Sequence, residues 1–254
     1  DLIEFHIRRL LSPPSLVVCG AGSGRNETCA LGLNWTQADD WVSLDEQHAA
    51  FSAAVRCGDD QLLLTGGWDH SCSRLSLRSG EWRRAPRLAK RWRHAAVVVG
   101  GVPLVSCGWG EGGALKSTLC LRDDEWRPGC DAPTARRDAA AALLAAADPL
   151  CPRVLLAGGQ LDNNTTRCLA TVEQYDAVSD RWQTLQDLPE AMGCVGAPLV
   201  GRSALVLQST NAVFSRCFRF DERDRGAWSP VSEPRVPSVD FAVASIGEFT
   251  VAHI

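Results

Sequence analysis

Short stretches that look like functional motifs occur along the chain, but each lacks a part that its chemistry needs. Residues 20–25, GAGSGR, resemble a glycine-rich phosphate loop without the following helix that would present amide groups to an anion. Residues 111–118, EGGALKST, resemble a P-loop, yet no glycine immediately precedes Lys116. His70 and Cys72 lie close together, but no second ligand pair with zinc-like spacing follows. The histidines and serines form no motif of a nucleophilic triad. We therefore expect a protein that is not an enzyme and that holds no metal or cofactor.

Basic residues gather in two segments, RLAKRWRH at residues 87–94 and PTARRDA at residues 133–139. Guanidinium groups suit the binding of acidic partners because they hold carboxylates in bidentate fashion, and tryptophan is enriched where interfaces are strongest. The alternative is that the arginines are solvated loop charges of little energetic weight and that Trp92 and Trp109 only pack between strands. The candidate partner-binding rim comprises Arg91, Trp92, Arg93, His94, Arg136 and Arg137.

The elements that would position these segments recur along the chain. A tryptophan in a similar setting returns at intervals of 41 to 56 residues. A strand ending in paired glycines precedes several of them, as at Gly66-Gly67 and Gly158-Gly159. A period in the forties with one strand-borne tryptophan per unit is typical of a propeller or a similar repeat array. The recurring tryptophans are Trp41, Trp82, Trp126, Trp182 and Trp228.

One unit shows its strands in full between residues 94 and 130. HAAVVVGG at 94–101 and PLVSCGW at 103–109 are apolar, LKSTLCLR at 115–122 alternates in polarity, and a short strand surrounds Trp126. Four antiparallel strands in about 40 residues are the content of one propeller blade. The fold predicted is therefore all-β, a six-bladed propeller of four-stranded antiparallel blades, incomplete as given. The expected blades are about 15–47, 48–92, 93–135, 136–191, 192–238 and, in part, 239–254.

Some units depart from this pattern. Residues 139–147 are nearly all alanine, the best helix former, but the repeat places them on the inner strand of their blade. The glycine pair is replaced by Cys107-Gly108 in the third unit and by Ser209-Thr210 in the fifth. The first unit lacks its inner strand and the last has two strands, so we expect the chain to be part of a longer protein, because a ring needs every blade edge paired.

The bulk composition narrows the class of protein. With 45% hydrophobic residues among 254, the chain can bury a full core and is not disordered. A net charge of −4 gives no electrostatic case for nucleic acid or an anionic membrane. No apolar run approaches the roughly 20 residues of a spanning helix.

Cysteine usage indicates a cytoplasmic protein. The eleven cysteines include several in expected strands, Cys19, Cys107 and Cys120, where a thiol acts as a small buried hydrophobe that a reducing compartment leaves unpaired. Four matches to the N-x-[ST] sequon leave an extracellular location open as the alternative, which would require a signal peptide upstream. A redox-sensing cysteine would need exposure and a lowered pKa, and Cys72 is the candidate by its expected loop position.

The repeat resembles the kelch repeat, in which a glycine pair ends the second strand, a tyrosine lies in the third and a tryptophan in the fourth. The fourth unit is the best match, with Gly158-Gly159, Tyr175 and Trp182, and the other units offer Leu77, Leu121 and Phe220 in place of the tyrosine. The resemblance covers about residues 15–254. It implies that the glycines, Tyr175 and the recurring tryptophans are structural.

Ahead of the repeats, IRRLLSPPS at residues 7–15 resembles the last helix and exit segment of a BACK domain, with Pro13-Pro14 as a stiff boundary. Residues 1–14 are therefore expected to be the end of a BACK-like helical domain and a linker. The resemblance to BTB–BACK–kelch adaptors implies substrate recognition for a cullin-RING E3 ubiquitin ligase. A BTB–BACK region upstream would bind the cullin and form a homodimer, and the propeller face would capture the protein substrate. The alternative is an actin-binding or scaffolding kelch protein with no ligase role.

Overall fold

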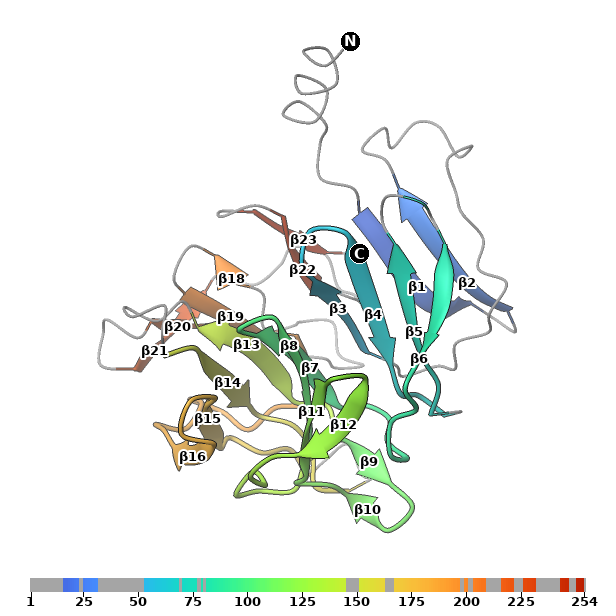
Figure 1. Ribbon diagram of the computed structural model, residues 1–254. Coiled ribbons are helices and arrows are strands. Elements are labelled where there is room, and N and C mark those ends of the chain that lie inside the picture. Colours follow the sequence, from blue (N-terminus) through green and yellow to red (C-terminus); the bar gives the residue numbers. More distant parts are fainter. Residues whose placement is uncertain are drawn as a thin grey trace. The chain divides into compact units, whose positions relative to one another are not determined.

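In the computed structural model the described residues are all-β, which confirms that part of the predicted fold class, while the six-bladed arrangement stays a prediction (Figure 1). The described residues contain strands, turns and bends, and no helix among them. The expected helical tail at residues 1–14 and the first recurring tryptophan, Trp41, lie outside the described residues. The structure describes residues 16–22, 25–31, 53–68, 70–76, 79, 81–144, 151–162, 167–196, 199–200, 203–208, 216–221, 226–231, 243–246 and 250–253.

The chain divides into two units, residues 1–50 and residues 51–254. In the first unit, β1 (Leu16–Gly22) and β2 (Arg25–Leu31) pair as an antiparallel hairpin in which Gly22 lies opposite Arg25. The GAGSGR stretch therefore spans the end of β1 and the start of β2.

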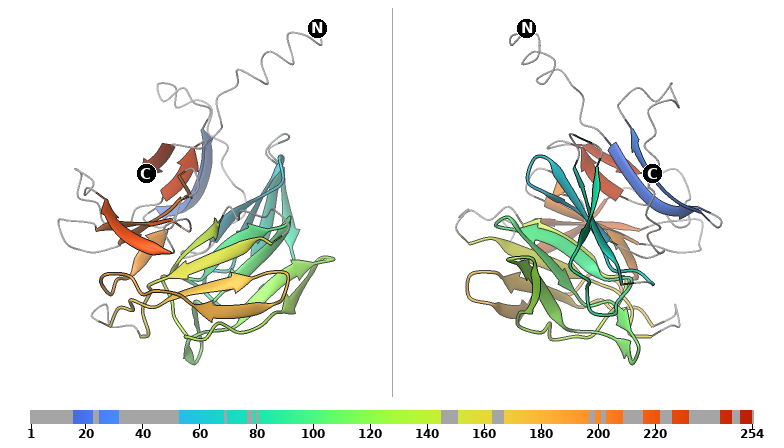
Figure 2. Two further views of the ribbon diagram at one scale, coloured as in Figure 1. Left: turned by 90° about the vertical axis from the view of Figure 1, so that its left-hand side faces the viewer. Right: turned by 45° about the vertical axis from the view of Figure 1, so that its right-hand side comes forward.

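The second unit consists mainly of consecutive antiparallel sheets, which follow one another in chain order from cyan to orange (Figure 2). In each of the first three sheets, the four long strands pair in the order in which the chain forms them. The first sheet comprises β3 (Ala53–Cys57), β4 (Gln61–Thr65), β5 (Cys72–Ser76) and β6 (Trp82–Ala85). The second comprises β7 (Ala95–Val99), β8 (Val102–Ser106), β11 (Thr118–Arg122) and β12 (Glu125–Pro128), with the short hairpin β9 (Trp109–Gly110) and β10 (Gly113–Ala114) inserted. The third comprises β13 (Ala140–Leu144), β14 (Arg153–Ala157), β15 (Val172–Asp176) and β16 (Arg181–Thr184).

The fourth sheet follows the same order with an interrupted first strand. Two short strands pair with different parts of the same neighbour, and the register shifts between Cys194 and Gly196. Its strands are β17 (Cys194–Gly196), β18 (Leu199–Val200), β19 (Ser203–Gln208), β20 (Cys217–Asp221) and β21 (Ala227–Val231). A separate hairpin follows, formed by β22 (Val243–Ile246) and β23 (Thr250–His253).

The first strands of successive sheets lie against one another: β3 contacts β7, β7 contacts β13, and β13 contacts β17. This explains why the alanine-rich segment forms strand β13 in spite of its helix propensity. Ala140 and Ala142 face a core shared with the fourth sheet, while Ala141 and Leu143 pack on a core shared with the second. Small side chains on both faces let the neighbouring sheets approach, and this packing outweighs local propensity.

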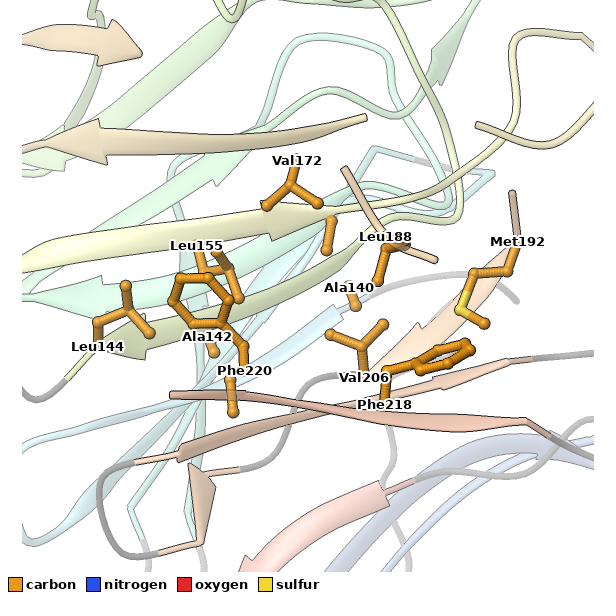
Figure 3. Packing of buried hydrophobic residues seen from close by; sticks show 12 residues of the cluster. Ala140, Ala142, Leu144, Leu155, Val172, Leu188, Met192, Val206, Phe218 and Phe220 are labelled. Atoms are coloured by element: carbon orange, nitrogen blue, oxygen red, sulfur yellow. The ribbon is translucent and has the colours of Figure 1, made fainter. Parts of the chain in front are cut away.

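The largest hydrophobic cluster lies between the third and fourth sheets (Figure 3). Leu155 and Val172 from the third sheet meet Val206, Phe218 and Phe220 from the fourth. All are buried, so the apolar faces of neighbouring sheets form the core of the unit.

Three of the recurring tryptophans, Trp126, Trp182 and Trp228, hold their sheets to the sheet before. Each lies in the outermost strand of its sheet, and its indole Nε1 donates a hydrogen bond to a main-chain carbonyl of the preceding sheet's final segment. The acceptors are Pro86 for Trp126 (2.9 Å), Cys130 for Trp182 (2.9 Å) and Gln186 for Trp228 (3.0 Å). Every acceptor stands four residues after the tryptophan of its own sheet, so the same contact repeats at three successive junctions.

The strand register shows what packs beside each tryptophan. Tyr175 lies opposite Trp182 and Phe220 opposite Trp228, with ring centroids 5.1 Å and 5.0 Å apart. Leu121 lies opposite Trp126, as the sequence predicted. In the first sheet Leu75 lies opposite Trp82, two residues before the expected Leu77, which lies outside the described residues.

Candidate partner-binding face

The linkers that lead into the first strands are held by the glycine pairs of the preceding sheets. Gly67 donates its N–H to the Arg91 carbonyl (3.1 Å), and the corresponding glycines donate to Arg136 (2.8 Å) and Met192 (2.8 Å). Both residues of each pair have positive φ, 67° at Gly66 and 95° at Gly67, and 63° and 105° at Gly158 and Gly159. Positive φ favours glycine at these positions, although Cys107 occupies the first of them in the second sheet with a φ of 62°.

Arg91 is one of the predicted rim residues, and the structure buries it. Its Nη1 donates to the carbonyl oxygens of Cys107 (3.2 Å) and Ser117 (3.0 Å), and Nη2 donates to the Ser117 hydroxyl (2.8 Å). The side chain is 2% exposed, and burial lowers its pKa to about 10. Its guanidinium therefore donates hydrogen bonds to main-chain carbonyls of the second sheet, into which its linker leads.

Arg136 takes the corresponding position in the next sheet. Nη1 donates to the carbonyl oxygens of Gly158 (2.8 Å) and Thr171 (2.9 Å), and Nη2 lies 2.7 Å from Oε1 of Glu173. Both charged side chains of this ion pair are fully buried. Neither Arg91 nor Arg136 presents its guanidinium to a partner in this arrangement.

A signal for this was present in the sequence. Arg91 and Arg136 occupy the same position of two successive units, and the corresponding residue of the following unit is Met192, which is also buried. A position that accepts arginine twice and methionine once is typical of an interior site that a long side chain fills.

His94 also lies inside, between the first and second sheets. Its Nε2 lies 2.8 Å from the Thr65 hydroxyl oxygen, and a Cβ added at Gly66 would be 2.6 Å from its Cε1. Burial, together with the nearby Arg91, lowers its pKa to about 3. The imidazole is therefore neutral at physiological pH and belongs to the packing of the first glycine pair.

Arg93 and Arg137 share one carboxylate. Oδ2 of Asp138 lies 3.0 Å from Nη1 of Arg93 and 2.7 Å from Nη1 of Arg137, and Arg137 Nε donates to the Asp162 carbonyl (2.9 Å). Arg93 and Asp138 both have positive φ, and the Asp138 N–H donates to the Arg93 carbonyl (3.0 Å). Of these side chains Arg93 is the more exposed, at 33% against 4% for Arg137.

A row of planar side chains runs along the loops and linkers at this end of the sheets. In each of the first three sheets, the second strand is followed by a glycine pair or, in the second sheet, by Cys107-Gly108. The residue that follows this pair packs on the linker that leads into the next sheet. Trp68 stacks on Trp92 with ring centroids 4.7 Å apart and planes at 23°, and the Arg137 guanidinium lies 5.6 Å from the centroid of Trp109. The corresponding residue of the third sheet is Gln160, whose Nε2 would lie 2.8 Å from a Cβ added at Gly193. We call Trp68, Trp92, Trp109, Arg137 and Gln160 the stacked track.

Main-chain hydrogen bonds also link residues of the stacked track across the loops. Trp92 and Trp109 exchange two hydrogen bonds of 3.0 and 2.8 Å, and Arg137 and Gln160 exchange two of 2.9 and 2.8 Å. The track is therefore held by backbone as well as by ring contacts. Trp68 is 55% exposed, which makes the aromatic end the accessible part.

Trp68, which directly follows the glycine pair, is not among the candidates predicted from the sequence. The informative signal is its repeat position, since Gly67-Trp68 aligns with Gly108-Trp109. Trp92 is one of the predicted rim residues; the structure stacks it on Trp68, and its binding of a partner stays a prediction.

The cysteine proposed as a redox sensor lies in strand β5 rather than in a loop. Cys72 is 2% exposed. Burial raises the pKa of Cys107 and of Cys217 to about 11 in each case. Redox sensing requires an accessible thiol of lowered pKa, and none of these three cysteines offers both.

Comparison of the chain with protein-family models and with curated proteins finds no match. Within the described ranges, no group of three or more histidine, cysteine, aspartate or glutamate side chains is placed to hold a metal ion. The described part of the chain also contains no helix long and apolar enough to cross a membrane.

Proposed function

We propose that this chain is a kelch-type β-propeller of six blades that binds a protein partner at the stacked track and performs no chemistry of its own. Consecutive sheets of the same strand order, with adjoining first strands, support this proposal. So does the tryptophan contact that recurs at three junctions, because a repeated junction is what a radial array requires.

The observation that carries the binding proposal is the exposed Trp68 stacked on Trp92. Exposure of a large apolar ring to water is unfavourable, so burial of Trp68, which is 55% exposed, would lower the free energy of a complex with a partner. Tryptophan is also the side chain most enriched among residues that dominate interface affinity. Loops supported by rigid sheets are where such binding residues concentrate.

The wider role that we propose is substrate recognition in a BTB–BACK–kelch adaptor of a cytoplasmic cullin-RING E3 ubiquitin ligase. It rests on the kelch pattern of the fourth unit and on the BACK-like segment at residues 7–15. The propeller would capture the substrate while a BTB–BACK region dimerises and binds the cullin.

The experiment compares partners captured by the full-length protein and by two variants in cells. Trp68→Ala removes the exposed ring, and Val178→Ala is the matched control because Val178 is 66% exposed in the turn after β15. We expect the cullin to co-purify with all three forms, and the substrate proteins to be lost only with Trp68→Ala. Loss of no partner would contradict binding at this face. Capture of actin filaments without a cullin would replace the ligase role by a cytoskeletal one.

A further inference from the structure

The equivalent arginines Arg91 and Arg136 use their guanidinium groups differently. In both, Nη1 donates to two main-chain carbonyls of the sheet that follows the linker. Thr171 takes the place of Ser117 in the third sheet, because the carbonyl of each accepts a bond from Nη1 of its arginine. Nη2 of Arg91 also donates to the Ser117 hydroxyl (2.8 Å), whereas Nη2 of Arg136 turns to a carboxylate instead. The exchange leaves the Thr171 hydroxyl without the bond that Ser117 has.

Three buried polar atoms around Arg136 form no hydrogen bond with any other residue that the structure describes. They are Nη2 of Arg136 itself, Oγ1 of Thr171 and Oε2 of Glu173. Nη2 lies 2.7 Å from Oε1 of Glu173, which makes an ion pair, but its N–H groups are not aligned for a hydrogen bond to that oxygen. Buried polar groups lose their hydration on folding, so each of these atoms needs a bonding partner.

The three atoms also lie close to one another. The Arg136 guanidinium contacts both other residues, because Nη1 donates to the Thr171 carbonyl (2.9 Å) and Nη2 meets the Glu173 carboxylate. Thr171 directly precedes β15 and Glu173 lies two residues further on, and residues two apart in an extended chain project to the same face. Arg136 and Glu173 are 0% and 1% exposed, so only a small molecule can reach this position.

We propose that one water molecule is bound between Arg136, Thr171 and Glu173. Water accepts a hydrogen bond from Arg136 Nη2, donates one to Glu173 Oε2 and forms a third with the Thr171 hydroxyl, and about three bonds are typical of a buried water. A neutral ligand suits the site, because the arginine and the carboxylate already balance each other's charge. The water ties β15 to the linker that carries Arg137, a member of the stacked track.

A high-resolution crystal structure of the wild-type protein tests the site directly. We expect an ordered water within hydrogen-bond distance of Arg136 Nη2, Thr171 Oγ1 and Glu173 Oε2. A structure in which the Thr171 hydroxyl bonds directly to the Glu173 carboxylate, or in which no water contacts these atoms, would overturn the inference. This measurement needs no variant, so it remains decisive where a substitution prevents folding.

Magnetic relaxation dispersion of water counts long-lived internal waters in solution and connects the site to its hydroxyl. Thr171→Val removes the hydroxyl and should lower the count by one, while Thr171→Ser keeps the hydroxyl and should keep the water. Ser117→Ala is the matched control, because the Ser117 hydroxyl bonds directly to Arg91 and its removal should not lower the count. An unchanged count in Thr171→Val, or an equal decrease in Ser117→Ala, would contradict a water held at Thr171.

Discussion

The indole Nε1 of Trp182 donates a 2.9 Å hydrogen bond to the carbonyl oxygen of Cys130, which belongs to the preceding sheet. The ring of Trp182 also packs on the apolar clusters of the second and third sheets. The contact thus combines a directional bond with a large apolar area at one junction. Trp126 and Trp228 form the same bond at the neighbouring junctions.

Trp182 variants should separate these two contributions. Trp182→Phe keeps much of the apolar contact and removes the bond, so we expect a loss of about 1–2 kcal/mol in the free energy of unfolding. Trp182→Ala also removes the ring and should lose about 3–5 kcal/mol. Urea denaturation measures both values. Equal losses for the two variants would show that the ring area contributes little.

Arg136 and Glu173 form a buried ion pair whose counterparts in the next sheet are apolar. Met192 occupies the position of Arg136, and the strand register aligns Phe218 with Glu173 because Tyr175 and Phe220 both face their tryptophans. Arg136→Met should destabilise the protein by about 3–5 kcal/mol, since it leaves the Glu173 carboxylate buried and unpaired.

The double variant Arg136→Met, Glu173→Phe should recover most of that loss, because it installs the pair that the chain already uses one sheet later. Chemical denaturation of the wild type, both single variants and the double variant gives the coupling energy. Additive losses in the double variant would mean that the Arg136 bonds to Gly158 and Thr171 matter more than the ion pair.

His94 should make stability depend on pH below neutrality. Its folded-state pKa of about 3 lies below the ordinary value of 6.5, so the unfolded chain binds a proton that the folded chain does not. Above pH 6.5 the group is neutral in both states and has no effect. As pH falls from there toward 3, stability decreases by at most about 1.4 kcal/mol per pH unit.

The check is the free energy of unfolding of the wild type and of His94→Gln between pH 7 and pH 4. Gln cannot titrate but can still reach the Thr65 hydroxyl, so we expect a smaller slope of stability against pH. Parallel curves would show that His94 becomes protonated within the folded protein.

Gly159 should tolerate no side chain. Its φ is +105°, and a Cβ would lie 2.7 Å from the Arg137 carbonyl oxygen. Gly159→Ala is therefore expected to cost about 2–4 kcal/mol through strain and displacement of that linker. Gly112 is the matched control, because a Cβ there would meet nothing within 4 Å. Thermal unfolding should show a large drop for the first variant and almost none for the second.

The repeat was visible in the sequence because its signals are local. Glycine pairs, recurring tryptophans and short apolar strands predicted the strand order of the sheets. The repeat also predicted a strand at residues 139–147 against the helix propensity of alanine, and the structure shows strand β13 at residues 140–144. The direction of the linker side chains was not predictable in the same way. Arg91 turns inward because carbonyls at Cys107 and Ser117, distant in sequence, are there to receive it. A charged residue in a loop suggests a surface position, and only the unit-to-unit comparison with Met192 argues otherwise.

The indole bonds of Trp126, Trp182 and Trp228 all point the same way along the chain, from a later sheet to an earlier one. Each sheet thus depends on its predecessor for the acceptor of its tryptophan, while its own tryptophan serves no later sheet. Damage to the second sheet should consequently weaken two junctions, because it removes the acceptor of Trp182 and also the tryptophan that binds Pro86 of the first sheet. Replacing the tryptophan ring of the second sheet alone, as in Trp126→Phe, should weaken only the junction with the sheet before it.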